Sequence, residues 1–278
     1  MDAALWAWET FGGVGGRTRR GFGALQRIDK DRDLPARPAD TATWLSEQLR
    51  RHVPAGDGLR DLPRLATKGV FAASLSLTSR PGVTPVPAGV WRYFIVQSDS
   101  WADGPAVWRY LIGRLRDFRQ QRTGGRFGRS LWPEPDAIRR LTGKVTRLRV
   151  PTGLDRFPRA AFGLPIVFHF KDDTLGDPQE TTLQGVPANA KQPHDRFASR
   201  LILRPLICAD NRPVAVAVVL KGPLTPPGGL MLGENDKRRG PPQQWQPLDA
   251  KLEPNDAATV PAMRGQQDVL QAFLRSLV

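Results

Sequence analysis

Apolar segments of strand length recur in pairs along this chain, and they constrain its fold more than any other feature. Runs rich in Val, Ile, Leu and Phe predict β-strands. We expect strands at residues 70–79, 90–98, 166–171, 181–186, 199–208 and 213–221. Strands that follow one another in pairs favour an antiparallel sheet.

Segments with helical periodicity separate these strands. We expect helices at residues 3–11, 41–53, 105–121, 137–142 and 266–277. In the strongest of them, 105–121, the apolar residues that share one face are Val107, Trp108, Leu111, Leu115 and Phe118. Helices mixed with paired strands predict an α+β fold with the helices on one face of the antiparallel sheet. The chain has 27 Gly and 26 Pro, which argues for long loops and against a helical bundle.

Charge is the second constraint. Lys and Arg number 41 against 27 Asp and Glu, a net charge of +14. An excess of this size favours a polyanionic partner such as RNA or DNA, and a merely solvated basic surface is the alternative. No apolar run is long enough to span a membrane, and the acidic N-terminus is unlike a signal peptide. We expect a cytoplasmic protein with no membrane partner.

Residue types that carry enzyme or metal chemistry are sparse. Cys208, the single cysteine, lies in the apolar run "RLILRPLICAD", so we expect a buried, inert thiol. The 3 histidines form no Cys/His ligand cluster, and we expect neither metal nor cofactor. His194 beside Asp195 leaves open a metal-independent RNA-cutting site, although one histidine without a defined partner is weak evidence for it.

The stretch "FGGVGGRTRRGFGAL" combines a bare backbone with three arginines. Its spacing matches neither the P-loop nor the dinucleotide fingerprint. Glycines let backbone N–H groups approach an anion, and guanidinium groups match phosphate oxygens. The candidate RNA-binding residues here are Gly12, Gly13, Gly15, Gly16, Arg17, Thr18, Arg19, Arg20, Gly21 and Phe22. A tight turn with solvated arginines is the alternative. The following "GFGALQRI" predicts the entry to a strand.

A second basic stretch lies at residues 105–149, with twelve Arg or Lys and three acidic residues, a local net charge of +9. Arginines interleaved with aromatic rings and glycines are typical of sites that bind unpaired RNA. The candidates are Arg126, Arg129, Trp132 and Arg139. In the alternative interpretation Trp132 belongs to the core and the arginines pair with Glu134 and Asp136.

Four segments together resemble one known family. Residues 11–25, "GRFGRSLWPEPDAIR" (125–139), "RAAFGLPIVFHF" (159–170) and "RFASRLILRPL" (196–206) are similar to the RAMP superfamily. Within it they resemble the first RAMP subunit of Cmr-type (type III-B) CRISPR effector complexes.

This resemblance implies tandem RRM-like (ferredoxin-like) domains and a non-catalytic, RNA-binding subunit of an antiviral ribonucleoprotein complex. The implied partners are guide RNA and target RNA near the 3′ end of the guide, and the other RAMP/Cas subunits. Two alternatives stay open. One is a metal-independent endoribonuclease that processes guide precursors, as some RAMP relatives do, and the other is a protein–protein scaffold.

The resemblance also predicts a domain organisation. Residues 1–28 would complete a partial first RRM-like domain, 29–60 would be a linker and helix, and 61–278 would form a second RRM-like domain. That second domain would carry a basic insert at 122–165 and a long loop at 222–262. The family's first domain has more strands before its glycine loop, so we expect its other part to come from a separate polypeptide or a missing segment.

Overall fold

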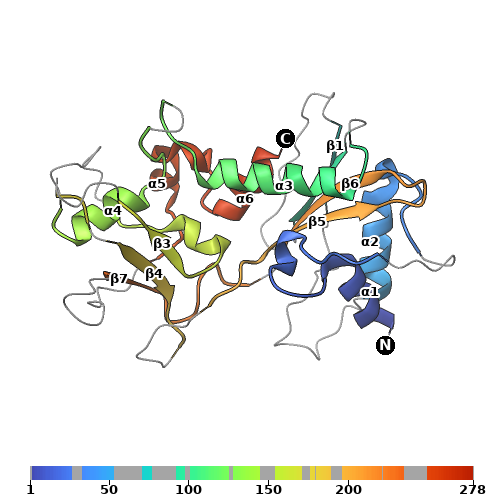
Figure 1. The fold of residues 1–278 in the computed structure, drawn as a ribbon, viewed down its shortest axis with the longest axis horizontal. Helices are drawn as coiled ribbons and strands as arrows, with labels where there is room; N and C mark the ends of the chain where they lie inside the picture. The colour runs from blue at the N-terminus through green and yellow to red at the C-terminus, as the bar shows by residue number, and fades with distance from the viewer. Residues whose placement is uncertain are drawn as a thin grey trace. The chain divides into compact units, whose positions relative to one another are not determined.

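The computed structural model combines helices with sheets, as expected for an α+β chain (Figure 1). It describes residues 2–26, 33–52, 71–76, 92–97, 101–124, 128–144, 154–170, 176–178, 180–188, 196–220, 222–234 and 249–277. Among the described residues, no helix is long and apolar enough to cross a membrane, and no group of His, Cys, Asp and Glu is placed to hold a metal.

The chain divides into two compact units, each built from segments far apart in sequence. Unit 1 comprises Met1–Asp117, Arg200–Gly222 and Phe273–Val278. Unit 2 comprises Phe118–Ser199 and Pro223–Ala272. These units do not follow the boundaries predicted at 28/29 and 60/61, because strands late in the chain pair with strands from its first half.

The sheet of unit 1 contains four of the six predicted strands. They are β1 (Phe71–Ser76), β2 (Arg92–Gln97), β5 (Leu201–Ile207) and β6 (Pro213–Val219), in the order β1-β2-β6-β5. The β2–β6 and β5–β6 pairs are antiparallel, as expected, whereas β1 and β2 run parallel. The sheet is therefore mixed, and β5 forms one of its edges.

Helices cover both faces of this sheet. On one face, Ile202, Val216 and Val218 pack in one core with side chains of α1 (Asp2–Phe11) and α2 (Thr41–His52). On the other face, Gly104 at the start of α3 (Gly104–Arg119) lies against the side chains of Pro205 and Ile207. The prediction that helices cover only one face of the sheet is wrong. Every residue of β6 is buried, and a strand that is apolar on both sides needs packing partners on both faces of the sheet.

Residues 2–26 have packing partners within unit 1, which the sequence did not lead us to expect. Trp6 and Phe11 of α1 share a core with Trp44, Leu45 and other residues of the unit. The predicted strand entry after the glycines is not formed, since residues 21–26 are a turn followed by a chain without ladder pairing.

Unit 2 has a smaller, fully antiparallel sheet in the order β3-β4-β7. Its strands are β3 (Ile166–Phe168), β4 (Thr181–Gly185) and β7 (Leu230–Glu234), and its helices include α4 (Glu134–Leu141) and α5 (Pro254–Thr259). The last helix of the chain, α6, spans Val269–Ser276. Both β7 and α5 fall in residues 222–262, which the sequence predicted to be a long loop. The core includes Ile138, Phe157, Leu183 and Leu232.

Candidate nucleic-acid interface

Residues 12–23 form a compact turn after α1, which we call the glycine–arginine loop. The Gly12 N–H donates to the carbonyl of Trp8 at 2.8 Å, and the Val14 N–H donates to the carbonyl of Gly23 at 2.9 Å, which closes the loop. Gly23 has a φ of 62°, and a Cβ there would lie 1.9 Å from the Val14 carbonyl oxygen. Only glycine fits this closure.

The tip of the loop leaves its backbone open. A Cβ on Gly15 or Gly16 would have no atom within 4 Å. Arg17 adopts a left-handed conformation with a φ of 62°, just before a 3-10 helix at Thr18–Arg20. Within the described ranges, the N–H groups of Gly15, Gly16 and Arg17 have no hydrogen-bond partner. Exposed N–H groups next to a guanidinium are suited to binding an anion.

The charge of the loop is entirely positive. Arg17 is exposed, Arg19 and Arg20 are half-buried, and the loop contains no Asp or Glu. Burial lowers the pKa of Arg19 below its usual value. Arg17 is therefore the cation of the loop with the best access to a ligand.

Trp108 of α3 holds the loop from one side. Its indole N–H donates to the carbonyl of Arg20 at 3.0 Å. Its ring meets Phe22 edge-to-face, with centroids 4.9 Å apart and planes at 76°, and Phe22 stays 40% exposed. The sequence assigned Trp108 to the buried face of the helix. Val107 and Leu111 are indeed buried there, while Trp108 is only partly buried against the loop.

Arg204 of β5 is the residue that sequence reasoning missed. Its side chain is buried with only 3% exposed, and it donates hydrogen bonds to the carbonyls of Glu9, Gly12 and Leu25. Desolvation lowers the pKa of Arg204 to about 10, opposed by the charge of Glu9. Arg204 thus ties the C-terminal end of α1 and the end of the loop to the edge strand. An arginine in the middle of the run "LILRPLI" was the available signal.

Two candidates of the second basic stretch have structural roles in unit 2. Trp132 is 3% exposed, its indole N–H donates to the carbonyl of Phe118 at 3.2 Å, and the two rings lie 5.3 Å apart. Arg139 is paired with Asp136 at 2.9 Å and with Asp177 at 2.8 Å. The structure therefore favours the alternative interpretation, in which Trp132 belongs to the core and Arg139 pairs with Asp136.

The other candidates are Arg126 and Arg129 of this stretch, and His194 of the endoribonuclease alternative. Arg129 is exposed, and its carbonyl accepts a hydrogen bond from the Thr123 N–H at 2.9 Å. Arg126 and His194 lie outside the described residues. The four candidates of the second basic stretch belong to unit 2, whereas the glycine–arginine loop belongs to unit 1.

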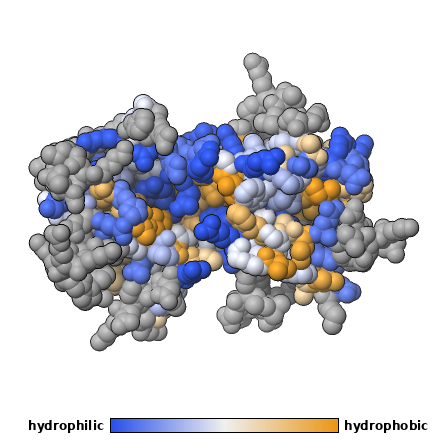
Figure 2. Space-filling model, in the orientation of Figure 1, coloured by the Kyte–Doolittle hydropathy of each residue, from blue (hydrophilic) through white to orange (hydrophobic). Residues whose placement is uncertain are grey.

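Exposed apolar side chains gather on α1 and the loop. Of the six large hydrophobic residues that are exposed in the described part of the chain, five lie between residues 5 and 25. They are Leu5, Trp8, Val14, Phe22 and Leu25. Figure 2 shows apolar surface interleaved with hydrophilic surface on the face turned to the viewer. Aromatic and cationic groups are thus available together on the same segment.

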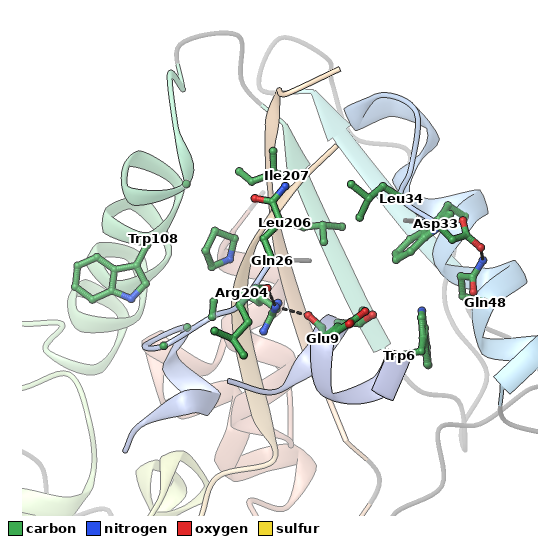
Figure 3. A pocket seen from close by; sticks show the side chains of 18 of the residues that line it. Trp6, Glu9, Gln26, Asp33, Leu34, Gln48, Trp108, Arg204, Leu206 and Ile207 are labelled. Carbon is green, nitrogen blue, oxygen red and sulfur yellow. Dashed lines mark hydrogen bonds between the residues drawn. The ribbon is translucent and has the colours of Figure 1, made fainter. Parts of the chain in front are cut away.

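A cavity of about 920 Å³ opens next to the loop, within unit 1. Figure 3 shows Trp108 at one end, Trp6, Asp33 and Gln48 at the other, and Arg204 between them. The Asp33 carboxylate accepts hydrogen bonds from the indole of Trp44 at 2.9 Å and from the amide of Gln48. Arginines 17, 19 and 20 do not line it.

Comparisons of the chain with protein-family models, curated proteins and solved structures find no match.

Proposed function

We propose that this protein binds single-stranded RNA through the glycine–arginine loop and performs no bond cleavage itself. We further propose that it does so as a subunit of a type III, Cmr-like CRISPR effector complex. There it contacts guide or target RNA near the 3′ end of the guide, beside other RAMP/Cas subunits. The resemblance of four segments to the RAMP superfamily supports this assignment, and so does an α+β architecture compatible with RRM-like (ferredoxin-like) domains.

One observation carries the RNA-binding proposal. The loop presents the exposed Arg17 next to the open backbone of Gly15 and Gly16, with no carboxylate in the loop to neutralise it. Trp108 and Arg204 hold the loop in place from α3 and β5. A cationic loop that is already ordered loses less conformational entropy when an anion binds.

Unpaired RNA fits this surface better than a duplex does. The cations lie on a short loop, and its one 3-10 turn, Thr18–Arg20, is too short to act as a recognition helix in a major groove. Phe22 offers a partly exposed ring beside them. Loops that combine arginine and aromatic side chains bind unpaired strands, because the guanidinium groups contact phosphates while the rings stack on bases.

The test is the affinity of purified protein for a fluorescent single-stranded RNA, measured over a series of salt concentrations. Arg17→Ala is compared with Arg275→Ala, which removes the same charge from an exposed position on α6. We expect Arg17→Ala to weaken binding several-fold and to reduce the log–log salt slope by about 0.7, the value for one phosphate contact on a single strand. We expect Arg275→Ala to change little. Equal effects of the two substitutions would contradict the proposal.

The same samples test the absence of cleavage. The RNA should be recovered intact after incubation with the wild-type protein. Cleavage that His194→Ala abolishes would support the endoribonuclease alternative instead. Failure to bind RNA even at low salt would indicate that the arginines contact acidic protein neighbours or are only solvated.

A further inference from the structure

The cavity in unit 1 begins where the glycine–arginine loop ends. Residues Gly21 to Gln26 form part of its wall, directly after Arg19 and Arg20. The carbonyl of Arg20 is held by the indole N–H of Trp108, and Trp108 itself lines the cavity. An RNA strand whose phosphate contacts the loop would therefore have its next nucleotide close to the aromatic end of the cavity.

This end of the cavity is suited to a flat ring. Phe22 and Trp108 both line it, and their edge-to-face contact fixes the orientation of each ring. Phe22 nevertheless keeps 40% of its surface exposed, so part of the ring remains available for a further contact. Stacking on aromatic side chains is the usual way to hold an unpaired base.

The charges that line the cavity differ from those on the loop. Four carboxylates line it, from Asp2, Glu9, Asp33 and Asp103. Of the lining arginines, Arg204 is engaged with three backbone carbonyls, and Arg51 lies 3.8 Å from Asp33. A phosphate would meet these carboxylates unfavourably, whereas an uncharged ring with N–H donors would not.

Resting on the RNA-binding function proposed above, we propose that this cavity receives one unpaired nucleobase of the bound strand. The phosphates stay on the glycine–arginine loop, the base packs against Phe22 and Trp108, and its exocyclic amino group faces the carboxylates. The cavity volume of about 920 Å³ lies within the range of pockets that enclose small organic ligands. The cavity thus adds a base preference to a loop that reads only the backbone.

The first experiment separates base from backbone. It measures the affinity for an adenosine decamer and for a decamer of abasic ribose phosphates, which has the same charge. We expect the wild-type protein to bind the adenosine decamer roughly tenfold more tightly, in line with stacking on one aromatic residue. Phe22→Ala should remove this difference and leave the affinity for the abasic decamer unchanged. Val167→Ala, at an exposed position on β3 of unit 2, should alter neither affinity.

Phe22→Leu is a control for the possibility that Phe22→Ala disrupts the loop itself. Leucine keeps apolar volume beside Trp108 but has no aromatic face, so we expect it to lose the preference for the adenosine decamer as well. A matched pair of pyrimidine decamers then tests the carboxylates. Cytidine carries an exocyclic amino group where uridine has a carbonyl, and we expect the cytidine decamer to bind more tightly.

The outcomes distinguish this inference from the proposed function. If neither the RNA nor the abasic decamer binds at low salt, RNA binding itself fails. If both bind equally to the wild-type protein, the loop binds backbone alone, and the cavity is left for another occupant such as a protein side chain. If Phe22→Ala weakens both decamers equally, Phe22 supports the loop and contacts no base. Each of the last two results overturns the inference and leaves RNA binding intact.

Discussion

The indole N–H of Trp108 donates a hydrogen bond to the backbone carbonyl of Arg20 across 3.0 Å, and it joins the glycine–arginine loop to helix α3. Arg204 holds the same segment from β5, through the carbonyls of Glu9 before the loop, Gly12 at its start and Leu25 after it. The two contacts reach the loop from opposite faces of the edge strand β5. Helix α3 lies over Pro205 on one face, and Arg204 points to the other face, towards α1. The loop is therefore a fixed part of unit 1.

Trp108→Phe should loosen the loop while preserving the apolar contact with Phe22. The lost hydrogen bond should cost about 1 kcal/mol. Amide exchange at residues 18–21 should accelerate, and RNA affinity should fall several-fold. Trp101→Phe is the control, because Trp101 packs on Tyr110 and not on the loop. Unchanged exchange at the loop in Trp108→Phe would show that the contact does not restrain it.

Arg204→Met should destabilise unit 1 although it removes a desolvated charge. Three backbone carbonyls lose their donor, those of the half-buried Glu9 and Gly12 and that of the exposed Leu25. A buried group left unsatisfied costs about 1–3 kcal/mol, partly offset by the relief of desolvation. We expect a net loss of about 2–4 kcal/mol in urea unfolding. Arg37→Ala, which breaks an exposed pair with Asp40, should change stability far less. Equal stability of the two variants would rule out an anchoring role for Arg204.

Gly23 and Gly16 should respond differently to alanine. At Gly23 the added Cβ would lie 1.9 Å from the Val14 carbonyl oxygen, so Gly23→Ala must open the loop and lower both stability and RNA affinity. At Gly16 the Cβ meets nothing within 4 Å, and stability should be preserved. A loss of RNA affinity in Gly16→Ala without a change in melting temperature would mark a close approach of the ligand to this backbone.

The stability of unit 1 should depend on pH through the thiol of Cys208. Burial is the main cause that raises the pKa of its thiol from 9.0 to about 11. Between about pH 9 and pH 11 the folded protein therefore binds more protons at this thiol than the unfolded protein does. The stability that the protonated thiol contributes is fully present below about pH 9 and is lost as the pH rises through about 11. Two pKa units correspond to about 2–3 kcal/mol. Urea unfolding at several pH values should show this loss in the wild type and a flatter profile in Cys208→Ala.

The thiol should also resist alkylation in the folded protein and react once urea unfolds unit 1. The burial that the sequence predicted for Cys208 is confirmed, and its lack of reactivity stays a prediction. Rapid reaction in the absence of denaturant would contradict both its burial and its raised pKa.

Glu134→Gln should destabilise unit 2. Glu134 is fully buried, lies 3.2 Å from the Arg159 guanidinium, and accepts the Arg159 backbone N–H at 2.9 Å. Burial, and then the charge of Arg159, lower the pKa of nearby Arg119. Removing the Glu134 carboxylate leaves two half-buried cations. Losing one member of a buried pair costs about 3–5 kcal/mol. Asp155→Asn, in a more exposed pair with Arg140, should cost much less.

Several elements were predictable because their signal is local. Helical periodicity placed α1, α2 and α3 to within two residues, and continuous apolar runs identified β5 and β6. The start of α4 was predicted three residues late, because its first hydrogen bonds go to the carbonyl of Pro133. The short strand β7 was missed because its pairing with β4, more than forty residues earlier, is what stabilises it.

The sequence by itself determined which segments carry charge, glycine and aromatic side chains, and hence the class of ligand that such segments suit. Only the tertiary structure decided which arginines face solvent and which hold the fold together. Arg17 stays exposed, while Arg139 is paired with Asp177 and Arg204 is buried under α1. The reason is that the environment of a charged side chain depends on partners far away in sequence, and no local pattern records where those partners lie.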